Sequence, residues 1–184
     1  MGYTTEFLGG FEFDKPVEPD FAEYLNDFAK MRHMRLNVDE VKKDDAEWAK
    51  HCFNGDMGFE GQFYVNLNEN LNRAEMSESV YGQKYYKMND DLFYNKNKYV
   101  IDSNTPAEGL PSLWCQWVVD TEENVLTWDG GEKFYHYVEW LNYLIKNFIS
   151  PSGYRLNGEV RWRGEDFDDI GTIVVQNNKV KVTH

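Results

Sequence analysis

The sequence has little cysteine, no long apolar run and a shortage of basic side chains. Its two cysteines, Cys52 and Cys115, stand far apart in dissimilar settings, so neither a disulfide framework nor a zinc-binding spacing is expected. This cysteine usage favours a reduced, cytoplasmic protein. No apolar stretch approaches the roughly 20 residues that span a bilayer, and no basic and apolar leader opens the sequence, so neither a membrane anchor nor a secretory signal is expected.

The shortage of basic residues gives the chain its strongest global property. Nineteen Lys and Arg stand against 32 Asp and Glu, a formal net charge of −13. A field of this sign repels phosphate backbones and anionic lipids, so direct binding of nucleic acid or membranes is disfavoured. Two interpretations of the acidity stay open: it keeps the protein soluble, or its carboxylates imitate the phosphates of DNA and occupy a basic partner protein.

Aromatic residues, in contrast, are plentiful. They make up 16% of the sequence, within a hydrophobic share of 41%, which predicts a core built from large rings. At 184 residues the chain suits one domain, residues 1–184, with two regular ends and an irregular or inserted segment at 37–111.

The N-terminal end predicts a strand followed by a helix. Residues 5–13 alternate polar with apolar around Gly9 and Gly10, which indicates a strand with a bulge or bend at the glycines. A helix is expected from Pro19 onwards. Its apolar face consists of Phe21, Leu25 and Phe28.

The C-terminal third predicts a hairpin, a helix and two further strands. Residues 112–120 and 124–130 indicate an antiparallel hairpin. Gly130-Gly131 then supplies a tight turn into a helix, with Asp129 or Glu132 serving the free N–H groups of its first turn and Ser150-Pro151 ending it. Seven apolar residues form one stripe on this helix, which predicts that it lies on a sheet: Phe134, Tyr137, Val138, Leu141, Leu144, Ile145 and Phe148. Residues 153–182 read as two strands around an acidic turn.

The middle of the chain has weaker patterns. Asp44 and Glu47 are spaced like a capping box at the start of a short helix, "DDAEWAKHCFNG". The following "GFEGQFYVNLN", residues 58–68, is a candidate strand. The remainder is too long for an ordinary connection, which indicates a functional or partly mobile segment.

These elements predict an α+β fold, with an antiparallel sheet and two main helices packed on one of its faces. The order of the elements matches a ferredoxin-like βαββαβ core plus a final strand. The alternative is a more curved sheet wrapped around the C-terminal helix, with the middle segment closing its open side.

One candidate ligand site lies on the first strand of the C-terminal pair. Arg161 and Arg163 point to one face of this strand beside Glu159 and Glu165, and guanidinium groups bind phosphate or carboxylate in a bidentate manner. The opposing interpretation is a solvated ladder of ion pairs between strands, each worth less than about 1 kcal/mol.

A second candidate site lies on the helix flank outside the apolar stripe, where His136, Trp140 and Tyr143 fall together. Trp140 is close enough to the stripe to be packed, under the middle segment, whereas His136 and Tyr143 are expected to be exposed. Exposed aromatics beside a histidine are typical of interaction surfaces, and simple hydration is the alternative.

The acidic turn "GEDFDDIG" is a candidate metal site. Asp166 and Asp168 alternate as in a calcium loop, but Ile170 takes the next ligand position and no closing Glu follows, so calcium binding of that type is disfavoured. A weaker magnesium site that uses Glu165, Asp166 or Asp169 stays open, with a purely structural turn as the alternative. The sequence identifies no cofactor.

Sequence signatures of enzymes are missing. No phosphate-binding loop, dinucleotide fingerprint, nucleophile elbow or zinc-protease motif occurs, and the four histidines are scattered. Cys115 lies between Trp114 and Gln116 in an expected strand, where a buried, inert thiol is the common case.

Four segments resemble a widespread family of small uncharacterised proteins of bacteria and their phages: "MGYTTEF", "LWCQWV", "WDGGEKFYHYVEW" and "LNGEVRWRGED". The resemblance covers both ends of the chain and implies that the hairpin, the helix and the acidic turn belong to one unit. It also implies a bacterial or phage origin, but it supplies no catalytic residues.

Three functions follow as hypotheses. The first is a non-enzymatic cytoplasmic binding protein, with a protein partner or a small anionic ligand. The second is a metal-dependent hydrolase of a nucleotide-like or phosphorylated substrate, which would use Arg161, Arg163 and the carboxylates of residues 165–169. The third is an acidic DNA-mimic inhibitor. The first is preferred because catalytic motifs are missing and aromatics are in surplus.

Overall fold

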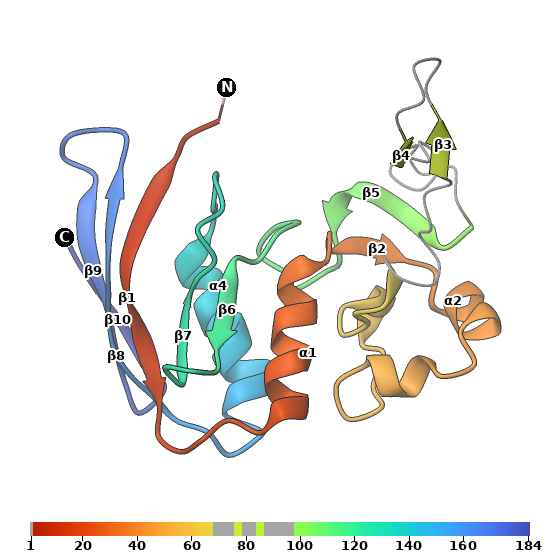
Figure 1. The fold of residues 1–184 in the computed structure, drawn as a ribbon, viewed down its shortest axis with the longest axis horizontal. Coiled ribbons are helices and arrows are strands. Elements are labelled where there is room, and N and C mark those ends of the chain that lie inside the picture. The colour runs from red at the N-terminus through yellow and green to blue at the C-terminus, as the bar shows by residue number, and fades with distance from the viewer. Residues whose placement is uncertain (1, 68–75, 79–83, 87–97) are drawn as a thin grey trace. The chain divides into compact units, whose positions relative to one another are not determined.

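A computed structural model describes residues 2–67, 76–78, 84–86 and 98–184 (Figure 1). The chain divides into two compact units. The sheet unit consists of residues 1–30 and 114–184, and the middle unit consists of residues 31–113. The boundaries of the middle unit lie close to those of the expected inserted segment, 37–111. Whether the whole chain acts as one domain, as expected, stays a prediction.

The sheet unit contains one six-stranded antiparallel sheet. The strand order is β10-β9-β8-β1-β7-β6, and neighbouring strands pair antiparallel throughout. The strands are β1 Thr5–Phe13, β6 Trp117–Asp120, β7 Val125–Trp128, β8 Leu156–Gly164, β9 Ile170–Gln176 and β10 Lys179–Thr183. An α+β fold with an antiparallel sheet is therefore confirmed, as are the N-terminal strand and the hairpin β6–β7.

Two helices complete the sheet unit and lie on the same side of the sheet (Figure 1). Helix α1 spans Pro19–Lys30, and α4 spans Tyr137–Leu144 and continues in a π-helical turn, Ile145–Ile149. Between helices and sheet lies an aromatic core, in which the ring of Phe7 approaches those of Trp117, Trp128, Phe134 and Tyr137 with centroids 4.9–5.7 Å apart. The core of large rings that the composition predicts is thus present.

Strand β1 depends on Gly9 for its close approach to β8. Its register with β8 is continuous from Thr5, opposite Gly164, to Phe13, opposite Leu156. Gly9 has φ +106°, and a Cβ at this position would lie 2.6 Å from the carbonyl oxygen of Glu159. The expected irregularity at the glycines is therefore a change of backbone conformation within a paired strand.

The start of α4 differs from the expected one. The helix begins at Tyr137 after His136, whose φ of +57° is left-handed and whose side chain makes no cap bond. Asp129 instead accepts a hydrogen bond from the backbone N–H of Gly131, within the turn that precedes the helix. The expectation that Asp129 or Glu132 caps the helix is wrong, because both residues precede Tyr137 by several positions and lie outside the first helical turn.

The middle unit has short elements around its own core. Strands β2 Met34–Leu36 and β5 Val100–Pro106 pair antiparallel, as do β3 Met76–Glu78 and β4 Lys84–Tyr86. Helix α2 spans Val38–Asp44, with Asn37 as its N-cap, and 3₁₀ turns follow at Trp48–His51 and Phe59–Gly61. The centre of the core is formed by Met34, Val41, Tyr64, Leu67 and Val100.

Three predicted elements are wrong in position or number. The helix expected from Asp44 is replaced by α2, which ends at that residue, and by a 3₁₀ turn. Residues 58–67 form no strand, because Gly58 and Glu60 have left-handed φ values of 71° and 52° that break an extended run. The C-terminal segment holds three strands, since Asn177 and Asn178 form a second turn, between β9 and β10. Residue 68 lies outside the described residues.

Among the helices that the structure describes, none has both the length and the apolar character needed to cross a membrane.

Candidate functional site

The face of the sheet opposite the helices carries the candidate site, and we call it the outer face. In β8 the side chains of Val160 and Trp162 are buried towards the helices, so the intervening Arg161 and Arg163 point outwards. The expected separation of an apolar and a charged side along this strand is confirmed.

Two exposed aliphatic side chains flank the arginines. Arg161 lies between Leu8 of β1 and Thr172 of β9, and Arg163 lies between Glu6 and Ile170 of the same two strands. Leu8 is 76% exposed and Ile170 is 52% exposed. These exposed aliphatic groups next to guanidinium groups give this part of the outer face a mixed apolar and basic character.

The charges of the outer face balance, in contrast with the acidic chain as a whole. Arg161 reaches Glu159 at 3.8 Å, but both side chains are more than half exposed, so this pair stabilises little. Across the six strands, four basic and four acidic side chains point to the outer face. They are Arg161, Arg163, Lys179 and Lys181, and Glu6, Glu12, Asp120 and Glu159. A sheet face of net charge near zero does not repel an acidic partner as the rest of the chain does.

The acidic turn at residues 165–169 is bound to the N-terminal segment. The carboxylate of Asp169 accepts hydrogen bonds from the Tyr3 hydroxyl at 2.7 Å and from the Trp162 indole N–H at 2.9 Å. Glu165 accepts the backbone N–H of Thr4 at 2.6 Å. The hydrogen bonds from Tyr3 and Trp162 lower the pKa of Asp169 below its usual range.

These bonds determine what the predicted metal ligands do. Asp169 has both carboxylate oxygens engaged by protein donors, and Asp166 donates its backbone N–H to the Tyr3 hydroxyl at 3.0 Å. Across the described residues, no three His, Cys, Asp or Glu side chains gather as they would around a metal ion. The Asp169 carboxylate and the Asp166 backbone thus hold the turn to Tyr3 and Trp162, and metal binding by Asp166, Asp168 and Asp169 stays a prediction.

His136, Trp140 and Tyr143 do not form one surface. Trp140 is fully buried and Tyr143 is 8% exposed, whereas His136 is exposed. The expectation that Tyr143 is exposed is wrong because α1 covers this flank of α4: Phe28 of α1 stacks on Tyr143 at 6.0 Å and meets Trp140 edge-on at 5.8 Å. Trp140 is packed as expected, but under α1.

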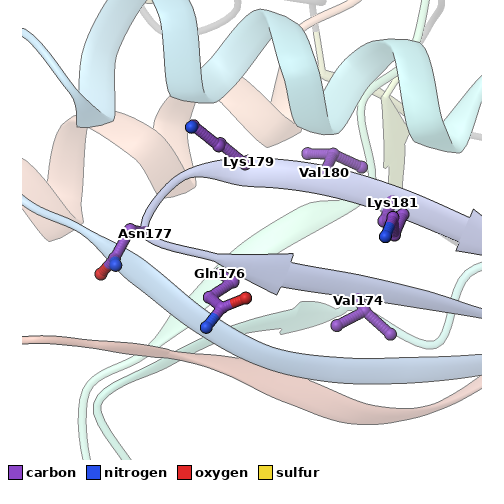
Figure 2. Close-up of a pocket in the computed structure, with 6 residues that line it drawn as sticks. All are labelled: Val174, Gln176, Asn177, Lys179, Val180 and Lys181. Carbon is purple, nitrogen blue, oxygen red and sulfur yellow. The ribbon is translucent and has the colours of Figure 1, made fainter.

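A shallow hollow lies at the β9–β10 end of the sheet unit. Figure 2 shows its lining residues, which come from both strands and from the turn between them. They are Val174, Gln176, Asn177, Lys179, Val180 and Lys181, around a volume of about 350 Å³. Sequence analysis missed this hollow because it treated the third strand of the segment as part of the second.

The middle unit holds a buried carboxylate that sequence analysis also missed. Asp45 is 5% exposed and accepts hydrogen bonds from the Tyr64 hydroxyl at 2.7 Å, from Asn66 Nδ2 at 3.4 Å and from the Glu47 backbone N–H at 3.0 Å. The ring nitrogen Nδ1 of His51 lies 2.9 Å from the same carboxylate.

Opposing influences act on the pKa of Asp45. Burial raises it, but the hydrogen bonds from Tyr64, His51, the Glu47 backbone and Asn66 together bring it below its ordinary value. The network therefore holds a buried negative charge in place.

The thiol near this network is not activated. The neighbouring Cys52 is buried, its thiol lies 3.1 Å from the carbonyl oxygen of Trp48, and burial raises its pKa to about 12. A thiol of that pKa is inert at neutral pH. Cys115 is likewise buried with a pKa raised to about 12, as the expectation of an inert thiol requires. Among the described residues, the Asp45 network is thus a set of hydrogen bonds within the middle unit without an activated thiol.

Comparison of the chain with protein-family models, with curated proteins and with solved structures finds no match.

Proposed function

We propose that this protein is a non-enzymatic binding protein and that the outer face of its sheet is the surface that meets a protein partner. The observation that carries the proposal is the pairing of Leu8 and Ile170, both more than half exposed, with Arg161 and Arg163 between them. Interfaces between proteins combine apolar side chains and arginine in this way.

The form of this surface favours a protein over a small ligand. Leu8, Arg161 and Thr172 lie in one row across three strands, and Glu6, Arg163 and Ile170 lie in the adjacent row. Such rows form an extended sheet surface, whereas small ligands bind in concave sites that enclose most of their area. A small anionic ligand held by the two arginines is therefore the weaker form of the proposal.

The other two hypotheses receive less support from the geometry. A metal-dependent hydrolase needs free carboxylates beside the arginines, but Glu165 and Asp169 accept hydrogen bonds from Thr4, Tyr3 and Trp162. A DNA mimic needs acids that follow one face of the molecule, and the outer face has equal numbers of basic and acidic side chains.

The fold and the setting belong to the same proposal. A ferredoxin-like core is supported by the chain order β1-α1-β6-β7-α4-β8 and by the spatial order β8-β1-β7-β6, to which β9 and β10 add at one edge. Free, buried cysteines support a cytoplasmic location. A bacterial or phage origin rests on the sequence resemblance alone.

The test compares two isoleucine substitutions in the full chain. Ile170→Lys places a charge beside Arg163 on the outer face, and Ile101→Lys places one on a strand of the middle unit, where the isoleucine is 45% exposed. Each variant and the parent are immobilised, and proteins captured from a bacterial lysate are quantified by mass spectrometry. We expect a protein that Ile101→Lys retains and Ile170→Lys loses at least tenfold. If the parent and Ile170→Lys capture the same proteins in the same amounts, the outer face is excluded as the binding surface.

A further inference from the structure

The two edges of the six-stranded sheet differ in how their backbone groups are satisfied. At the β6 edge, Asn26 of α1 binds Val119 through both side-chain groups. Its Oδ1 accepts the Val119 N–H at 2.8 Å, and its Nδ2 donates to the Val119 carbonyl oxygen at 3.2 Å. The amide of Asn26 therefore takes the place that another strand would occupy, and this edge is closed.

The β10 edge carries no such cap within the described parts of the chain. Strand β10 pairs with β9 alone, through a two-residue turn in which Asn177 and Asn178 both have left-handed φ, at 48° and 67°. In a hairpin of this type the residues that flank the turn exchange both backbone hydrogen bonds, and the pattern alternates from there. Val180 and Val182 therefore direct their N–H and C=O groups away from β9.

The side chains of β10 determine what can pair with this edge. Lys179 and Lys181 lie opposite Gln176 and Val174, so they share the outer face, and they border the hollow of about 350 Å³ (Figure 2). Val180 and Val182 lie opposite the buried Val175 and Ile173 and belong to the apolar side. An added strand would meet ammonium groups on one side and valine side chains on the other.

We propose that the β10 edge binds an extended acidic segment of a partner protein as a seventh strand. The segment alternates carboxylates, which face Lys179 and Lys181, with aliphatic residues, which pack beside Val180 and Val182. Main-chain hydrogen bonds to the two valines supply affinity, and the alternate side chains supply specificity. This inference names the partner chemistry of the binding function proposed above and rests on it.

A second copy of this chain fits the edge less well. Two β10 strands paired with each other would bring four lysine side chains together on one face, and like charges in neighbouring strands repel. Lysine on an edge strand is also a common means of preventing strand addition. That protective role predicts that the edge rejects every peptide whatever its charge, so the experiment below separates the two roles.

The experiment uses the full chain labelled with ¹⁵N and two synthetic peptides. The first is Thr-Val-Glu-Val-Glu-Val-Thr with blocked ends, and the matched control has Lys in place of both Glu. With the acidic peptide we expect the amide signals of Val180 and Val182 to shift in a saturable manner, and that of Val119 at the closed edge to stay in place. The Lys179→Glu/Lys181→Glu variant should lose at least tenfold in affinity for the acidic peptide and bind the basic one. Val182→Pro, which removes an outward N–H, should lose at least tenfold for both.

The inference is overturned if the amide signals of β10 ignore the acidic peptide at millimolar concentration, or respond equally to both peptides. If the β10 amide signals do not respond but Ile170→Lys loses the captured partner, the proposed function stands. The β10 edge is then excluded as the site of contact. If the β10 signals respond and Ile170→Lys captures the same proteins as the parent, the inference is supported and the surface around Ile170 and Arg163 is excluded as the contact.

Discussion

At the scale of single residues, the clearest energetic consequence belongs to Asp45. Replacing this carboxylate with an amide, Asp45→Asn, leaves shape unchanged but presents an N–H group to donors such as the Tyr64 hydroxyl. A mismatched buried polar group costs about 2 kcal/mol, so we expect a loss of this size in the free energy of unfolding at pH 7, measured by urea denaturation. Asp39→Asn, at an exposed position on α2, is the control and should change the free energy by less than about 0.5 kcal/mol.

The same carboxylate gives a prediction about pH. Because the folded pKa of Asp45 lies below the unfolded value of about 3.9, its contribution to stability is complete above that pH and is lost as the pH falls through the folded pKa. The difference in urea midpoint between the parent and Asp45→Asn should therefore shrink as the pH falls below about 4. A difference that grows towards acid pH would contradict the assignment of a lowered pKa.

Gly9 allows steric contact to be separated from backbone conformation. Gly9→Ala combines a left-handed φ with a Cβ 2.6 Å from the Glu159 carbonyl oxygen. Gly130→Ala has a similar φ of +85° but no atom within 4 Å of the added methyl group. We expect Gly130→Ala to cost about 1 kcal/mol and Gly9→Ala at least about twice as much, from urea denaturation of both variants. Equal losses would mean that β1 moves away from β8 without cost.

At the scale of elements, the turn between β9 and β10 holds the hairpin to β8 through one of its two asparagines. Asn178 accepts the Leu156 N–H at 2.6 Å and donates to the Tyr154 carbonyl oxygen at 2.8 Å. Both asparagines have left-handed φ, which glycine adopts freely. We expect Asn178→Gly to lose about 1–2 kcal/mol of stability and Asn177→Gly to change it by less than about 0.5 kcal/mol, measured by thermal unfolding. Equal effects would show that turn conformation, and not the side-chain bonds, determines the stability of this hairpin.

Elements were predictable where local pattern and tertiary contact agree. Leu141 and Leu144 of α4 are buried as the helical wheel predicts, and Val160 and Trp162 alternate with the arginines as a half-buried strand requires. The wheel could not show that α1 covers Tyr143, because Phe28 lies more than a hundred positions away. The candidate sites were harder to predict for the same reason. The outer face combines β1, β8 and β9, and no single segment of the sequence indicates that these strands pair.

Local pattern failed in the middle unit, where irregular backbone is stabilised by side chains. The alternation at 58–67 resembles a strand, but this segment places Tyr64 and Asn66 on Asp45 instead. Asp45, His51 and Tyr64 have no characteristic spacing, because a carboxylate that accepts bonds from coil and 3₁₀ residues follows no helical or strand period. Such a network becomes visible only when the chain is folded.

At the scale of the whole molecule, each of the two units has its own core. In the sheet unit Phe11, Trp117 and Phe148 are fully buried, and in the middle unit Val41 and Leu67 are. Units with separate cores can unfold as separate cooperative segments, whereas the expectation of a single domain requires them to unfold together. Substitutions confined to one core distinguish these possibilities.

Native-state hydrogen exchange of two variants, one in each unit, tests this point. Asp45→Asn weakens the middle unit, and Gly9→Ala weakens the sheet unit. If each unit unfolds on its own, the first variant should lower the protection of Val41 and leave that of Trp117 within about 0.3 kcal/mol, and the second should do the reverse. Equal losses at both amides in both variants would instead establish one cooperative domain. Because the proposed binding surface and the β10 edge lie wholly within the sheet unit, separate unfolding further predicts that Asp45→Asn binds the acidic peptide as the parent does.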